Sequence, residues 1–265
     1  MSVQSALVTE KGFEYDRRWM LIDENNRFIS QRELPEMTQL QVSILDLGLK
    51  VTHKTNKDSI IIPLKALGST VEHTVISIWD DICTVEYVSE EADKWFTSVL
   101  AFKCRLVYMP DCCKRSVDQR YAPKDAVTSF SDAYPYLLIG QASLDNLNSR
   151  LNESLLMNRF RPNIVFTGGE PFEEDMMGQI TINGVNFYGV KLCARCAIIT
   201  INQHTGLKGK EPSKTLASYR SKNNKILFGQ NLIHNGTGFV SVGDLLKVIS
   251  INTEERFIIN ESNDA

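Results

Sequence analysis

The sequence predicts an α+β protein that is mainly β, with a few short helices. Short runs of alternating or β-branched residues recur along most of the chain, with turn residues about every 8–12 positions, whereas only three segments show helical spacing of apolar residues. Strands therefore do not alternate regularly with helices, and a barrel or sandwich is favoured over βαβ units. We expect one domain at residues 1–105 and a second at 106–265, divided near the polar segment 110–124.

Length and composition limit the functions to be considered. The chain has 265 residues, is 43% hydrophobic and carries a net charge of −3, so it can bury a sizeable core but has no basic surplus for nucleic acid. Residues 1–5 lack the features of a signal peptide, and no run of about 18 apolar residues occurs. We expect a cytoplasmic protein with no membrane partner and with its six cysteines reduced.

The first half predicts a series of strands and one helix. The helix is expected to begin after Ser89, a typical N-cap, and to direct Trp95 and Phe96 into the core. Cys83 and Cys104 lie in apolar runs and are expected to be buried, whereas the pair Cys112-Cys113 lies among charged residues and is expected at the surface. The strands are expected at residues 3–8, 19–22, 28–31, 40–44, 47–51, 59–63, 75–79, 83–88 and 104–109.

The second half predicts fewer strands and two short helices. Ser143 is expected to cap a helix with Leu144, Leu147, Leu151 and Leu155 on one face. Pro162 is expected to hold Arg161 in an extended conformation at the start of a strand. Asn183-Gly184 indicates a hairpin between 180–182 and 185–190. Further strands are expected at 136–139 and 197–201 and as a closing pair within 239–249. A short helix is expected to open at Glu211-Pro212-Ser213 and run to Arg220, and the end of the tail after 252, which contains the apolar run 257–259, is expected to fray.

The motif Cys193-Ala194-Arg195-Cys196 allows four interpretations. A structural zinc site needs four ligands, and no second cysteine pair has suitable spacing. A thioredoxin-like redox pair should open a helix, whereas a strand is expected here. A nucleophilic cysteine would need His204 or His234 nearby, which the sequence does not place. The fourth interpretation is a single thiolate that binds a transition metal, which soft sulfur favours.

Basic residues near this motif indicate an anionic ligand. Arg161 stands at a strand start and Arg195 directly precedes Cys196, so a group bound through a thiolate would also meet guanidinium forks. The alternative is a β-rich core that carries two incidental thiols.

Several further motifs resemble, in order, those of the MOSC family, named for the C-terminal domain of molybdenum-cofactor sulfurases, in the branch that includes the mitochondrial amidoxime-reducing component. The resemblance covers almost the whole chain. Its motifs are Asp16-Arg17-Arg18-Trp19, Gln31-Arg32-Glu33-Leu34-Pro35, Phe160-Arg161-Pro162-Asn163, Phe172-Glu173-Glu174-Asp175, Cys193-Ala194-Arg195-Cys196, Glu211-Pro212, Phe228-Gly229 and Val242-Gly243-Asp244.

This resemblance implies an N-terminal β-barrel-like domain packed on a MOSC β-barrel domain, with molybdenum cofactor, a molybdopterin, held between them. Cys196 takes the family's role of metal ligand, and Cys196 and Asp132 are the implied catalytic residues. The implied cofactor-binding residues are Arg17, Ser131, Asp132, Arg161, Asn163, Ala194, Arg195 and Cys196. The role of Cys193 stays open.

The implied activity is that of a molybdenum-dependent oxidoreductase, which removes oxygen from small N-hydroxylated compounds such as amidoximes, hydroxylamines and N-hydroxylated bases. The alternatives are a non-catalytic carrier of molybdenum cofactor or sulfur, and a catalytically empty fold. The family's early Pro-x-Lys-Ser segment does not match Ser2-Val3-Gln4-Ser5, and we find no run of closely spaced cysteines typical of a 2Fe-2S domain. Electrons are therefore expected from a separate flavin or iron-sulfur reductase.

Overall fold

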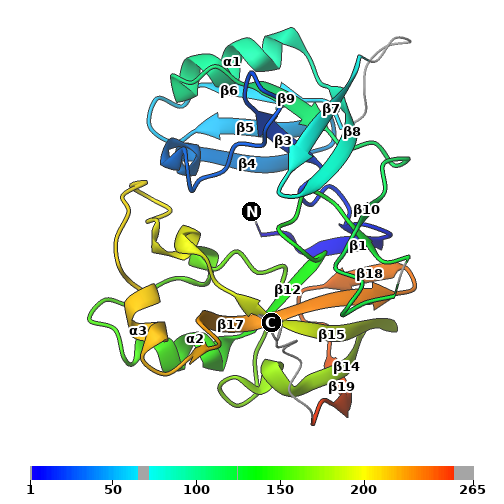
Figure 1. The fold of residues 1–265 in the computed structure, drawn as a ribbon, viewed down its shortest axis with the longest axis vertical. Helices are drawn as coiled ribbons and strands as arrows, with labels where there is room; N and C mark the ends of the chain where they lie inside the picture. The colour runs from blue at the N-terminus through cyan, green and yellow to red at the C-terminus, as the bar shows by residue number, and fades with distance from the viewer. Residues whose placement is uncertain (1, 65–71, 124, 254–265) are drawn as a thin grey trace, which may run out of the picture.

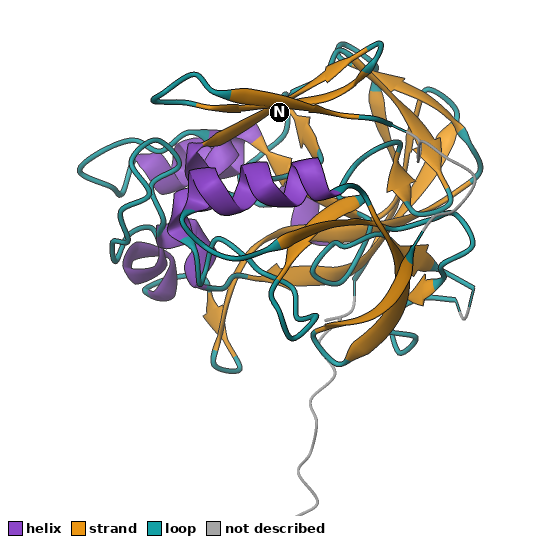
Figure 2. Cartoon of the chain, turned by 90° about the horizontal axis from the view of Figure 1, so that it is seen from above, coloured by secondary structure: helices purple, strands orange, loops and turns teal. Residues whose placement is uncertain are grey.

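The structure is a computed structural model that describes residues 2–64, 72–123 and 125–253, arranged as two stacked halves (Figure 1). Strands dominate both halves, which confirms the mainly β fold class predicted from the sequence. Helices gather on one side of the molecule and most strands lie on the other (Figure 2). Among the described residues, no helix has the length and apolar character needed to cross a membrane.

The N-terminal half contains two antiparallel sheets and one helix, α1 (Glu90–Leu100). Phe96 and Leu100 on α1 pack into a core shared with both sheets. As predicted, the Ser89 side chain caps α1, because its hydroxyl accepts a hydrogen bond from the Ala92 N–H at 3.1 Å. The first sheet has the order β3 (Trp19–Ile22), β9 (Arg105–Tyr108), β8 (Asp81–Tyr87), β7 (His73–Ile78), and the second β4 (Leu40–Leu45), β5 (Gly48–His53), β6 (Ser59–Ile62).

The C-terminal half is built on a seven-stranded sheet flanked by short helices. Its hairpin at Asn183-Gly184 is confirmed, with positive φ at both residues, as a type I′ turn requires. The sheet order is β13 (Ile164–Phe166), β12 (Tyr136–Gly140), β17 (Lys225–Asn235), β15 (Val185–Ala194), β14 (Met177–Ile182), β19 (Leu246–Ile251), with β16 (Ser221–Lys222) beside β17. Among the described strands of this sheet, β12 and β13 pair in parallel and the other pairs are antiparallel. The helices of this half are α2 (Gln141–Asn148) and α3 (Ser213–Ala217), with 3₁₀ turns η2 (Met157–Arg159), η3 (Glu173–Met176) and η4 (Ala197–Thr200). A further 3₁₀ turn, η1 (Pro35–Gln39), precedes β4 in the N-terminal half.

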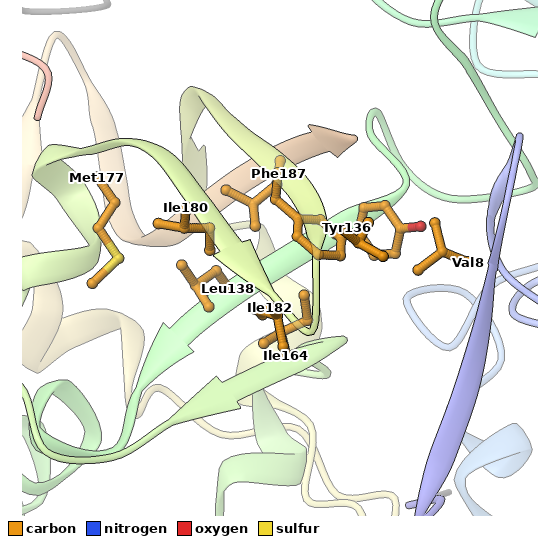
Figure 3. Close-up of a cluster of buried hydrophobic side chains, with 10 residues drawn as sticks. Val8, Tyr136, Leu138, Ile164, Met177, Ile180, Ile182 and Phe187 are labelled. Atoms are coloured by element: carbon orange, nitrogen blue, oxygen red, sulfur yellow. The ribbon is translucent and has the colours of Figure 1, made fainter. Parts of the chain in front are cut away.

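The first strand of the chain packs on the C-terminal half. β1 (Ser5–Thr9) pairs with β2 (Gly12–Phe13) and with β18 (Gly238–Ser241). Val8 of β1 joins the same buried cluster as Tyr136 and Phe187 (Figure 3). The small ladder β10 (Arg115–Ser116) and β11 (Val127–Thr128) connects the halves. The division at 105/106 stays a prediction.

Ser143 does not cap a helix, so this prediction was wrong. The N-cap of α2 is Gly140, and Ser143 lies inside the first turn with its hydroxyl directed into the protein. There it donates to Glu174 Oε2 at 2.7 Å and accepts the Phe172 N–H at 2.7 Å. The helix ends at Asn148, so the last two leucines of the predicted face lie beyond it. Local sequence suggested a cap because it cannot show that a buried carboxylate competes for the same hydroxyl.

The run 197–201 is not a strand but mainly the 3₁₀ turn η4. Pairing between β15 and β17 reaches Ala194 and Leu227, and the Arg195 N–H then bonds to Ile226 O at 2.7 Å. Beyond this point the β-branched residues have no long strand to pair with, and Ile199 is instead buried below the turn. Packing of Ile199 into the core, rather than pairing in a sheet, stabilises this apolar run.

Four smaller expectations also differ from the structure. The run 28–31 forms only an isolated bridge from Phe28 to Ile22. Arg161 adopts φ of +57° rather than an extended conformation. The two closing strands do not pair with each other, because β18 joins β1 and β19 joins β14. Cys112 is exposed as expected, but Cys113 is half-buried against the cluster that contains Cys83.

The burial predicted for Cys83 and Cys104 is confirmed. The predicted fraying of the tail and the run 257–259 lie outside the described residues.

Candidate functional site

A cavity of about 570 Å³ lies between the two halves, and all of the residues predicted for the site are on its wall. The structure thus brings together Arg17, Ser131, Asp132, Arg161, Asn163, Ala194, Arg195 and Cys196. One part of the wall is polar, and another is formed by apolar side chains from the N-terminal half, including Leu40, Leu49 and Phe96.

Cys196 stands where β15 has ended and η4 begins, which leaves its thiol on the cavity wall. It is the residue that precedes η4, has an extended backbone with φ of −100° and is exposed. Its Sγ accepts a hydrogen bond from Nε of Arg32 at 3.2 Å. Cys196 therefore presents a sulfur atom to the cavity, where it can take a further ligand.

Arg32 is the main cavity residue for which the sequence gave no individual role. Its Nη2 donates to Asp132 Oδ2 at 2.7 Å, and its guanidinium lies over the Trp79 ring, 4.9 Å from the centroid. The side chain is 19% exposed. No local signal could have revealed this arrangement, because Arg32 and Cys196 are 164 positions apart.

Arg17 and Arg161 form a second cationic group. Arg17 pairs with Asp16 through Nη1, and its Nη2 donates to the backbone oxygen of Arg161 at 3.3 Å. Asn163 Nδ2 donates to the same oxygen of Asp16 at 2.7 Å, and its Oδ1 accepts the Leu137 N–H. The amide of Asn163 thus positions Asp16 and, through it, Arg17.

The Arg161 guanidinium makes no hydrogen bond to any described residue, although its side chain keeps accessible surface on the cavity wall. Desolvation in the cavity lowers the pKa of Arg161, and repulsion from Arg17 acts in the same direction. Arg17, Arg32 and Arg161 face Asp16 and Asp132, which leaves an excess of one positive charge. This part of the cavity can bind an anion.

Arg195 and Ser131 also use their polar groups within the protein. Nη1 of Arg195 donates to Cys193 Sγ at 3.2 Å, and its Nη2 donates to Phe160 O at 2.8 Å. The hydroxyls of Ser131 and Thr128 are hydrogen-bonded at 2.5 Å. Arg195 and Ser131 therefore fix the shape of the wall, and Arg195 gives the half-buried Cys193 a partner of its own.

A further polar region of the wall contains Tyr134 and Lys191. The Tyr134 hydroxyl is buried without a hydrogen-bond partner among the described residues, and burial raises its pKa. Lys191 Nζ lies 3.9 Å from Asp118 and 4.2 Å above the Tyr121 ring. A buried hydroxyl without a protein partner is uncommon in folded proteins.

The geometry also bears on the other interpretations of the cysteine motif. Neither His204 nor His234 is among the residues on the cavity wall, so no histidine there is placed to activate Cys196. Within the described ranges, no group of three or more His, Cys, Asp or Glu side chains is arranged to hold a metal ion. Cys193 and Cys196 both line the cavity, but Cys193 is half-buried beside Arg195 whereas Cys196 is exposed. This arrangement is compatible with one thiolate that binds a ligand-carried metal.

Fold and cavity together define a two-part β-rich protein with a cationic cavity that has an exposed thiol on its wall. Family models match the chain twice, as the MOSC N-terminal beta barrel domain at residues 1–103 and the MOSC domain at residues 125–247. The chain belongs to the MOSC family, as the sequence motifs predicted.

Named relatives fall into two groups at similar identity. The chain is 32% identical to mitochondrial amidoxime-reducing component 1 of Mus musculus, over 92% of this chain and 76% of that protein. Mitochondrial amidoxime reducing component 2 of Bos taurus is also 32% identical, over 82% and 65%. Molybdenum cofactor sulfurase of Oryza sativa subsp. japonica is 32% identical over 86% of this chain, which spans only 30% of that protein.

The cavity wall fits the molybdenum cofactor that these relatives and the MOSC domain imply. A soft sulfur ligand is available at Cys196, and free N–H groups of Arg161 suit a phosphate. The thiol and the guanidinium groups on the wall are therefore compatible with the metal and the phosphate of the cofactor.

Proposed function

We propose that this protein binds molybdenum cofactor through Cys196 and reduces small N-hydroxylated compounds. The observation that carries the proposal is the exposed Cys196 sulfur on the wall of a cavity that also holds Arg17 and Arg161. The similarity to amidoxime-reducing components supports the choice of substrate class. The overall reaction consumes two electrons and two protons, breaks the N–O bond, forms an N–H bond and releases water.

The cofactor, when bound, supplies the redox chemistry that removes the oxygen atom. The protein's own residues hold and orient the reactants. Cys196 would bind the metal, Arg161 and Arg17 would bind the phosphate, and Asn163 would keep Arg17 in place through Asp16. Asp132 is proposed to take a proton from solvent and pass it on through the carboxylate oxygen that Arg32 does not engage.

Ala194, Arg195 and Ser131 complete the proposed binding wall. Arg195 and Ser131 would act mainly by fixing its shape, because their side chains bond to neighbouring protein groups. We further propose that electrons come from a separate flavin or iron-sulfur reductase and that the protein works in the cytoplasm. The names of its relatives include mitochondrial components, so localisation with a fluorescent fusion provides the check on the second point.

Metal analysis tests the role of Cys196. Molybdenum and pterin are measured in wild type, Cys196→Ser and the matched Cys193→Ser, all produced in a host that makes the cofactor. We expect molybdenum to be lost from Cys196→Ser and retained in Cys193→Ser, because Cys193 is half-buried beside Arg195. Equal molybdenum in wild type and Cys196→Ser would remove Cys196 as the ligand.

A turnover assay then separates the enzyme from a carrier. Loaded wild type should oxidise a reduced viologen dye when an amidoxime or hydroxylamine is added. Bound cofactor without dye oxidation would favour the alternative of a non-catalytic carrier of molybdenum cofactor or sulfur, which the similarity to molybdenum cofactor sulfurase makes the second candidate. Protein without pterin would indicate a catalytically empty fold.

A further inference from the structure

Arg32 has a place in the cavity that neither the motifs nor the relatives assign. We propose that Arg32 is a positioning residue for the Cys196 sulfur, whose N–H···S hydrogen bond fixes that sulfur and tunes the metal bound to it. This inference rests on the proposed function, because it assumes that Cys196 is the ligand.

Three contacts hold the Arg32 guanidinium in one orientation. Nε points to Cys196 Sγ at 3.2 Å, Nη2 points to Asp132 at 2.7 Å, and the guanidinium carbon lies over the Trp79 ring, 4.9 Å from its centroid. A lysine could not reproduce this set, since an ammonium group has neither the flat face nor the fixed fork of a guanidinium. The arrangement therefore uses properties that only arginine supplies.

The backbone of Arg32 is also tied to the opposite half. Its carbonyl oxygen accepts a hydrogen bond from Lys208 Nζ at 2.9 Å. The Arg32 N–H is directed at Ser30 Oγ at 3.3 Å. The guanidinium is thus anchored at both ends of the side chain, which limits its freedom to leave the sulfur.

The two cysteines of the motif have separate arginine partners. Arg195 is adjacent to Cys196 in sequence, but its guanidinium bonds to Cys193. The N–H donor to Cys196 comes instead from Arg32, in the other half of the molecule. The hydrogen bond from Arg32 to Cys196 Sγ therefore forms only while the two halves are packed together.

A hydrogen bond to a metal-bound sulfur has two physical consequences. Outer partners orient a ligand, and their loss typically weakens metal binding or activity. A positive N–H donor also withdraws electron density from the thiolate, which stabilises the reduced metal and raises its reduction potential. Removing the Arg32 donor should therefore lower the potential of bound molybdenum.

Cofactor-loaded wild type, Arg32→Lys and Arg32→Gln test this inference. The readouts are molybdenum content, the Mo(V) electron paramagnetic resonance spectrum and the Mo(VI)/Mo(V) potential. Arg105→Lys is the matched control, since Arg105 also pairs with an aspartate, Asp93 at 3.0 Å, and stacks on an aromatic ring, Tyr87, but is not among the cavity-lining residues. Urea unfolding checks that each variant is folded.

We expect both Arg32 variants to shift the ratio of reduced to oxidised metal about tenfold toward the oxidised form, which is about 59 mV for a one-electron couple. Their spectra should change, whereas Arg105→Lys should match wild type. Loss of molybdenum from folded Arg32 variants alone would also support the inference. Normal metal content with unchanged potential and spectrum in both Arg32 variants would overturn it and leave the proposed function intact. Absence of molybdenum from wild type would overturn both.

Discussion

The buried hydroxyl of Ser143 provides a quantitative test of how this fold is stabilised. Ser143 and Glu174 are both fully buried, and the hydroxyl donates to the carboxylate at 2.7 Å while it accepts the Phe172 N–H at 2.7 Å. A hydrogen bond to a charged group contributes about 1.5–3 kcal/mol, and an N–H left without a partner costs about 1–3 kcal/mol. Ser143→Ala should therefore lower the free energy of unfolding by about 3 kcal/mol or more.

Urea unfolding of wild type, Ser143→Ala and Ser89→Ala measures this difference. Ser89 is a true N-cap, so its loss should lower the free energy of unfolding by only about 1 kcal/mol. Ser143→Asp adds a second discrimination, because a cap position tolerates aspartate, whereas a new carboxylate next to Glu174 would be repelled. A loss for Ser143→Ala no larger than that for Ser89→Ala, together with a stable Ser143→Asp, would refute this reasoning.

The remaining predictions concern two other buried charges and the anion site. Arg220→Met leaves Asp175 buried and unpaired, so urea unfolding should show a loss of about 3–5 kcal/mol, and Arg220→Met combined with Asp175→Leu should recover part of it. Burial raises the pKa of Glu174 in the folded protein, so the free energy of unfolding of wild type should fall as pH rises from the unfolded-state pKa toward the folded-state pKa. The difference in free energy of unfolding between wild type and Glu174→Gln should therefore shrink between pH 4 and pH 7. A difference that stays constant with pH would contradict a raised pKa. Arg161→Ala should weaken retention of pterin about tenfold or more on gel filtration, whereas Arg159→Ala should not.

Most of the secondary structure could be predicted from local sequence. Strands β3 to β9, helix α1 and the Asn183-Gly184 hairpin follow from alternation, capping and turn chemistry, which act within a few residues. Predictions failed where a local preference met a distant competitor. Ser143 turned inward to Glu174, and the run 197–201 had no long strand to pair with.

The candidate site could be predicted as a set of residues but not as an arrangement. Sequence motifs identified Cys196, Arg17 and Arg161, and the structure places all three on one cavity wall. The motifs did not show that Asn163 acts through Asp16, or that Arg195 is directed at the other cysteine. Residue type indicates which contacts a side chain can make, whereas its neighbours in space decide which it makes.

The sequence by itself determined the mainly β character and the family, and through the family resemblance it indicated Cys196 as the proposed ligand. Only the tertiary structure decided that β1 completes a sheet with β18 and that Arg32 meets Cys196 from 164 positions away. Short-range periodicity records how each segment is buried, because neighbouring side chains alternate between core and solvent. Contacts between distant segments depend instead on which surfaces remain uncovered once each half has packed, and one chain's local pattern does not contain that information.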